Sequence, residues 1–275
     1  MKEETMASSN PVFNNSPAFS ERPGKAAEIY RPTPNLSADQ LSELYNRPAA
    51  TSSDTDRMTY EDTIVKTVIS FVILLVGAGV GWFIPVLALP AALVGFVLAL
   101  VNIFKKKPSA GLVLAYAAVE GIFVGGITVF FESRYPGIAV QAVMGTFVVV
   151  GVTLALFASG KIRASKKATK IFLIAMVGYL VFSVLNVILS MTGVIKSANG
   201  MRDFTIAGIP LGVIIGILVI IMAAYSLVLD FDSIQRGVQR GAPRVYAWAG
   251  AFGIMVTVVW LYLEILRLLS ILRGR

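Results

Sequence analysis

Four acidic residues stand in long apolar stretches of the sequence: Glu120, Asp230, Asp232 and Glu264. The chain has no histidine and no cysteine. Their absence excludes a thiol nucleophile, a Ser-His-Asp triad, a disulfide framework and a Cys/His zinc site. Carboxylates must therefore carry any acid–base or ion-binding chemistry, and we expect no enzymatic activity.

Two carboxylates held close together in a low-dielectric site share a proton or jointly bind a cation. Oxygen ligands alone favour a hard cation, Ca²⁺ above the transition metals. The four acids are therefore candidates for an ion or proton site, with Ca²⁺ as a bound or transported ion and no other cofactor.

Structural pairing is the alternative role for two of these acids. Asp232 and Arg236 are four residues apart, and Glu264 and Arg267 are three apart. Both spacings place the two side chains on the same face of a helix, where they can form an ion pair. The residue pattern alone leaves both roles open.

The composition places the acids in a membrane protein. Of 275 residues, 56% are hydrophobic and 15% charged, whereas soluble domains are nearer one half and one quarter. Residues 1–62 hold ten of the sixteen acids against six basic residues, so the remainder carries six acids against eighteen. We predict a disordered cytoplasmic tail over residues 1–60, without a signal-peptide pattern, and a membrane domain over 61–275.

Seven apolar runs after the tail are long enough, at 1.5 Å per residue, to cross a hydrocarbon core of about 30 Å. Helices are expected, because lipid offers no partner to open backbone groups. The predicted fold is an all-α integral membrane bundle of seven transmembrane helices. The predicted spans are Ile64–Ile84, Val86–Phe104, Gly111–Phe131, Ile138–Ser159, Ile171–Met191, Ile206–Leu229 and Trp248–Leu272. Three pairs of glycines at four-residue spacing predict close helix packing: Gly77 with Gly81, Gly121 with Gly125, and Gly212 with Gly216.

Basic residues concentrate in alternate links between the spans. Short cytoplasmic links retain Lys and Arg, so we predict a cytoplasmic N-terminus and an outside C-terminus in the cell (inner) membrane. These residues border a lipid bilayer, so anionic headgroups are expected partners and nucleic acid is not. Arg202 is assigned to a water-exposed outer link beside Asp203. The inner links contain Lys105, Lys106, Lys107, Lys161, Arg163, Lys166, Lys167, Lys170, Arg236, Arg240 and Arg244.

Several motifs resemble one family of membrane proteins. Leu227–Gln235, followed by a basic link and Trp260–Leu269, looks like the last two spans of the Bax inhibitor (transmembrane Bax inhibitor motif) family in its bacterial form. Ala118–Gly126 and Ala142–Thr146 are similar to its central spans. The resemblance covers residues 64–272. It implies a bundle with the last helix central and a pH-sensitive calcium leak governed by an acid pair on the last two spans.

By position, Asp232 matches the family's sixth-span aspartate, with Asp230 nearby, and Glu264 replaces the seventh-span aspartate. The resemblance thus implies a metal or proton site at Asp232 and Glu264. These two residues are 32 positions apart, more than we expect in the family, so Glu120 is the alternative partner of Glu264. The first three predicted spans contain no arginine to match the family's basic latch residue, and Arg267 is the candidate replacement.

The leading functional prediction is therefore a pH-sensitive Ca²⁺ leak channel gated by carboxylates of the last two spans. One alternative is a non-conducting regulator that binds a membrane protease or another membrane protein through the tail and basic links. A second is a small-solute transporter, because transporters bind solutes at broken helices and Gly125, Gly126 and Pro210 are helix-interrupting residues.

Overall fold

The computed structural model describes residues 56–195, 197 and 200–274. Within these residues, seven helices are long and apolar enough to cross a membrane. This confirms the predicted all-α bundle. The predicted tail lies outside the described residues except for positions 56–60. The seven helices are α4 (Tyr60–Phe83), α5 (Ala88–Phe104), α6 (Ala110–Arg134), α7 (Ile138–Ala158), α8 (Lys166–Met191), α9 (Leu211–Gln239) and α10 (Ala247–Arg273).

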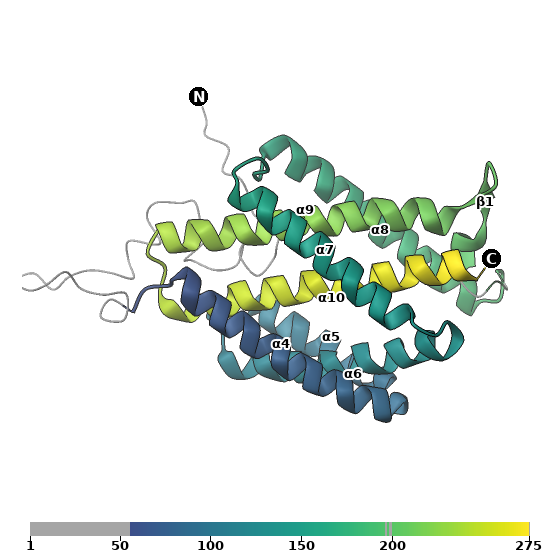
Figure 1. Cartoon of the computed structure of the whole chain (residues 1–275), viewed down its shortest axis with the longest axis horizontal. Coiled ribbons are helices and arrows are strands. Elements are labelled where there is room, and N and C mark those ends of the chain that lie inside the picture. The colour runs from purple at the N-terminus through teal and green to yellow at the C-terminus, as the bar shows by residue number, and fades with distance from the viewer. Residues whose placement is uncertain (1–55, 196, 198–199, 275) are drawn as a thin grey trace, which may run out of the picture.

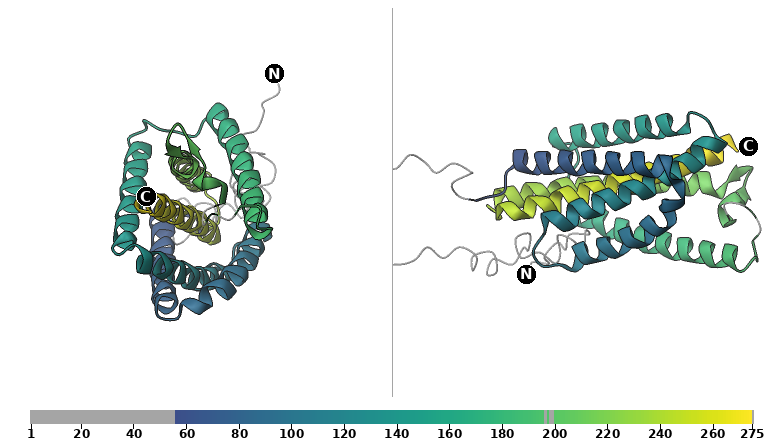
Figure 2. Two further views of the ribbon diagram at one scale, coloured as in Figure 1. Left: turned by 90° about the vertical axis from the view of Figure 1, so that its right-hand side faces the viewer. Right: turned by 90° about the horizontal axis from the view of Figure 1, so that it is seen from below.

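Helix α10 is the centre of the bundle. It packs against α4, α6, α7 and α9, and the end-on view shows it surrounded by the other helices (Figure 2). Half of its most apolar segment is buried inside the protein, whereas only 6% of the most apolar segment of α8 is buried. The last helix is thus central, as the family resemblance implies, and its side chains are enclosed by protein on most sides.

The basic links lie at one end of the bundle, where α4 begins and α9 turns into α10 (Figure 1). We call this the basic end and the other the opposite end. The prediction that the basic end faces the cytoplasm rests on the charge distribution. At the opposite end, η3 (Gly200–Asp203) and a hairpin of β1 (Thr205–Ile206) and β2 (Ile209–Pro210) connect α8 to α9. Two further 3₁₀ turns, η2 (Pro85–Leu87) and η4 (Arg244–Tyr246), precede α5 and α10.

The predicted bounds of the sixth span are wrong at both ends. The span was expected at Ile206–Leu229, whereas α9 runs from Leu211 to Gln239. The start moves because Ala207 and Gly208 have φ angles of 51° and 80° and form the hairpin turn. The end moves because the helix continues through both aspartates and Arg236, which therefore belongs to α9 rather than to a link.

Glycines bring α4 and α6 into backbone contact, as predicted. A Cβ atom built on Gly77 or Gly81 would collide with a carbonyl oxygen of α6, and one built on Gly121 or Gly125 would collide with a carbonyl oxygen of α4. Only a residue without a side chain permits this approach. By contrast, a Cβ on Gly79 of α4 would meet nothing within 4 Å.

The described end of the predicted tail packs on the bundle. The backbone N–H of Met58 donates to Ala242 O at 2.7 Å, and that of Arg244 donates to Asp56 O at 2.8 Å. The Met58 side chain is 2% exposed. Thr59 then caps α4 by accepting from the N–H of Asp62 at 3.1 Å. These contacts attach the start of α4 to the turn between α9 and α10.

Candidate functional site

Glu264 lies inside the bundle and is surrounded by charged and hydroxyl groups. The residue is 3% exposed and sits on central helix α10. Its Oε1 accepts a hydrogen bond from Arg267 Nη1 at 2.6 Å and another from the Tyr179 hydroxyl of α8. Its Oε2 lies 3.7 Å from Arg202 Nη1. One carboxylate thus joins groups from α8, η3 and α10, and we call Glu264, Arg202, Arg267 and Tyr179 the Glu264 cluster.

The sequence assigned Arg202 to a water-exposed link, and the structure corrects this. Arg202 is 5% exposed because η3 folds back against α8. Gly200 has a φ of 65°, and the N–H of Met201 donates to Asn186 Oδ1 of α8 at 2.7 Å. The guanidinium donates from Nη2 to the Tyr179 hydroxyl at 3.0 Å. It also lies 5.8 Å from the Phe182 ring centre. The turn therefore directs Arg202 toward α10.

Arg202 and Glu264 form an ion pair without a hydrogen bond between them. Nη1 and Oε2 are too far apart at 3.7 Å, and each is buried without a hydrogen-bond partner among the described residues. Two unit charges about 4 Å apart still attract by about 4 kcal/mol at an effective dielectric constant of 20, before desolvation is counted. The contact is thus electrostatic and sensitive to the charge of Glu264.

Asp230 occupies a second buried position inside the bundle. It is fully buried at 0% exposure and accepts a hydrogen bond from Thr257 Oγ1 of α10 at 2.7 Å. Thr257 also lies 3.4 Å from the Ser226 hydroxyl of α9. Seven residues separate Thr257 from Glu264, or about 10 Å along α10. The two acids therefore lie at different levels along α10.

Asp232 does not pair with Glu264. It forms an ion pair with Arg236 on its own helix, with Oδ2 3.1 Å from Nε. The separation reflects the antiparallel course of the helices, since Asp232 lies closer to the basic end than Asp230 does. The structure contains both ion pairs that helical spacing allows: Asp232 with Arg236 and Glu264 with Arg267. The structure adds Arg202 and Tyr179 to the second.

Glu120 also lies apart from Glu264. Its carboxylate faces α5, where a Cβ built on Gly95 would lie 2.9 Å from Glu120 Oε2. Tyr116, one turn earlier on α6, is 4% exposed and makes an edge contact with Phe252 at a ring distance of 5.0 Å. Glu120 is therefore half-buried between α5 and α6, and the structure does not join it to the acids of α9 and α10.

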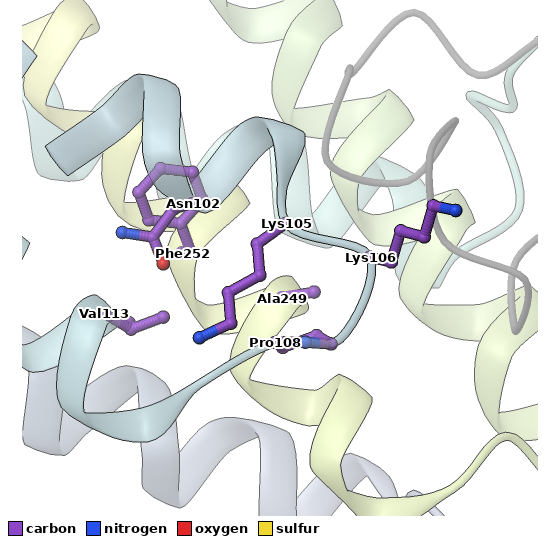
Figure 3. A pocket seen from close by; sticks show the side chains of 7 residues that line it. All are labelled: Asn102, Lys105, Lys106, Pro108, Val113, Ala249 and Phe252. Carbon is purple, nitrogen blue, oxygen red and sulfur yellow. The ribbon is translucent and has the colours of Figure 1, made fainter. Parts of the chain in front are cut away.

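No group of three acids comes together in the described part of the chain as a candidate metal site. The small pocket beside the α5–α6 link is not a ligand site either. Figure 3 shows Lys105 pointing toward it from beside Asn102, while Lys106 points away. Its volume is about 10 Å³, room for about one water molecule. The Glu264 cluster and Asp230 are therefore the chemically distinctive groups of the bundle.

Sequence reasoning missed Arg202, Tyr179 and Thr257 as partners of the acids. Arg202 and Tyr179 come from α8 and the following connection, far from Glu264 in sequence. Arg202 stands beside Asp203 and near Lys196, a pattern typical of a solvated link. A tyrosine and a threonine within apolar spans carry little signal by themselves.

Nearly the whole sequence matches a family model. The model of the family described as Bax inhibitor 1 like matches residues 10–274, which includes all seven helices and the Glu264 cluster. A search of the curated proteins finds no match. The match agrees with the motifs of the central and last spans and with the central position of α10. The chain belongs to the Bax inhibitor 1 like family.

Proposed function

We propose that this protein is a pH-sensitive cation leak channel, with Ca²⁺ as the expected ion. The observation that carries the proposal is Glu264: an almost completely buried acid on the central helix, facing Arg202 and Arg267 from two different elements. Charged groups within membrane spans are costly and typically mark ion or proton pathways. Membership in the Bax inhibitor 1 like family supports the same function.

In the proposed pathway, the ion passes along the contact between α9 and α10. Asp230, with Thr257 and Ser226, supplies oxygen atoms part-way along this contact, and oxygen is the ligand that Ca²⁺ prefers. Glu264 lies further toward the opposite end. The acids are separate rather than gathered into one chelating site, so we propose that the ion is a passing substrate.

In this proposal, the charge of Glu264 keeps the ion pathway closed and makes it respond to pH. In its charged form it holds Arg202, and with it η3, against α10. Protonation removes the negative charge facing Arg202, Arg267 and Tyr179, the groups presented to it by η3, α10 and α8. The two arginines keep their charge. Protonation thus biases the bundle toward an arrangement in which η3 is released, a population shift driven by one charge.

The test is calcium flux into proteoliposomes that hold a calcium-sensitive dye and the full-length protein. Glu264→Gln is neutral at every pH, so we expect its flux to be independent of pH and equal to the acidic-pH flux of the wild type. Glu61→Gln is the matched control, because Glu61 is exposed at the start of α4, and it should retain the wild-type pH response. A full pH response in Glu264→Gln would refute the gating role. A wild-type protein without calcium flux would refute the channel itself and favour the non-conducting regulator.

A further inference from the structure

A long apolar groove runs along the bundle between α4 and α7. Residues of α9 and α10 form its floor, and α6 contributes one edge. Its volume is about 1130 Å³, above the roughly 300–1,000 Å³ of typical small-molecule sites. Along α4 it extends from Tyr60 to Trp82, about 33 Å at helical rise. The groove is thus as long as a bilayer's hydrocarbon core is thick.

The groove opens sideways, away from the bundle. Side chains on both of its walls are half-exposed, including Val72 and Leu75 of α4 and Phe147 and Leu154 of α7. In a membrane these side chains face lipid, because a protein with seven apolar spans lies in the bilayer. An occupant can therefore enter from the surrounding lipid.

Arg163 lies at the basic end of the groove and provides a charge there. Its guanidinium stacks over the Phe157 ring at 4.6 Å, and its Nη1 donates to Gln235 Oε1 at 2.7 Å. Arg163, Phe157 and Gln235 all line the groove. These two contacts hold the arginine above an otherwise apolar channel, while the exposed guanidinium keeps other N–H donors for a ligand.

We propose that this groove binds an anionic phospholipid, with the phosphate at Arg163 and an acyl chain along α4 and α7. The charge complementarity favours this occupant over a partner's apolar transmembrane helix, which would leave Arg163 facing no anion. Lipid tails are as apolar as the groove walls, so the walls do not select one lipid over another. Selection comes from the headgroup, because Arg163 is the charged residue that lines the groove and attracts an anion.

Two variants separate the headgroup contact from the groove. Arg163→Gln removes the charge, and Lys167→Gln is its control, a change of the same kind at an exposed lysine that does not line the groove. Gly79→Leu narrows the groove, because Gly79 lines it and a Cβ there meets open space. Gly151→Leu is its control on α7, where a Cβ also meets nothing within 4 Å and the residue is outside the groove.

The measurement is native mass spectrometry of the full-length protein from micelles with equal amounts of phosphatidylglycerol and phosphatidylcholine. We expect the wild type to retain phosphatidylglycerol with a preference of about fivefold, the factor expected for one basic residue at an anionic surface. Arg163→Gln should bind the two lipids equally, and Gly79→Leu should retain less of both than the wild type. The two controls should match the wild type.

Three outcomes would overturn the proposal. They are an absence of bound lipid on the wild type, retained preference in Arg163→Gln, and undiminished lipid in Gly79→Leu. A second copy or another polypeptide bound in place of lipid, and displaced by Gly79→Leu, would assign the groove to that partner. The outcome is independent of calcium flux.

Discussion

Removing the charge of Glu264 should destabilise the protein more than removing the charge of Arg202. In Glu264→Gln, Arg202 stays 5% exposed and loses the acid that faces it. Breaking a buried ion pair by removing one partner costs about 3–5 kcal/mol. In Arg202→Gln, Glu264 keeps Arg267 at 2.6 Å and its bond from Tyr179. That variant loses the 3.7 Å contact with Glu264 and the hydrogen bond to Tyr179. We expect this loss to lower the free energy of unfolding by about 1–2 kcal/mol.

The assay is thermal unfolding of each purified variant in the same detergent. For a domain of this size, 1 kcal/mol corresponds to about 2–4 °C in Tm. We therefore expect Glu264→Gln to lower Tm by roughly 10 °C and Arg202→Gln by roughly 4 °C. The double variant should be more stable than Glu264→Gln alone, because it removes the unpaired buried charge. Arg134→Gln, at an exposed arginine of the opposite end, should leave Tm unchanged.

Two results would refute this reasoning. If Arg202→Gln lowered Tm as much as Glu264→Gln, Arg267 would not be compensating for the lost arginine. If the two changes were additive in the double variant, the residues would not interact, since neighbours in one charge network normally show coupling of about 0.5–3 kcal/mol.

Three further variants test the packing and the second buried acid. Gly125→Ala should destabilise the protein by about 1–3 kcal/mol, because its Cβ would meet the backbone of Ala78. Gly79→Ala is the control and should be neutral or slightly stabilising. Equal Tm values for the two variants would contradict the close approach of α4 and α6. Thr257→Val keeps the side-chain shape but removes a hydrogen bond to Asp230, so we expect a loss of about 1–2 kcal/mol and reduced calcium flux. Wild-type Tm and flux in Thr257→Val would remove Thr257 from the proposed pathway.

Much of the fold follows from local sequence. Six of the seven predicted spans agree with the helices to within a few residues at most ends. The length and hydropathy of an apolar run are local properties of the sequence, and bilayer thickness sets the length that a spanning helix needs. The sixth span shows the limit of this reasoning. Ile206 and Ile209 extend the apolar run, but positive φ angles at Ala207 and Gly208 turn the chain before the helix begins.

The sequence by itself determined the class of protein, the acids that stand within apolar spans and the restriction to carboxylate chemistry, because composition and burial cost depend on residue type alone. Only the tertiary structure decided the partners of those acids. Glu264 meets Arg202 and Tyr179 because η3 folds back on α8 beside the central helix, while Asp232 and Glu120 lie elsewhere. Coulomb attraction depends on distance in space, and distances between helices are set by packing, such as the glycine contacts of α4 and α6.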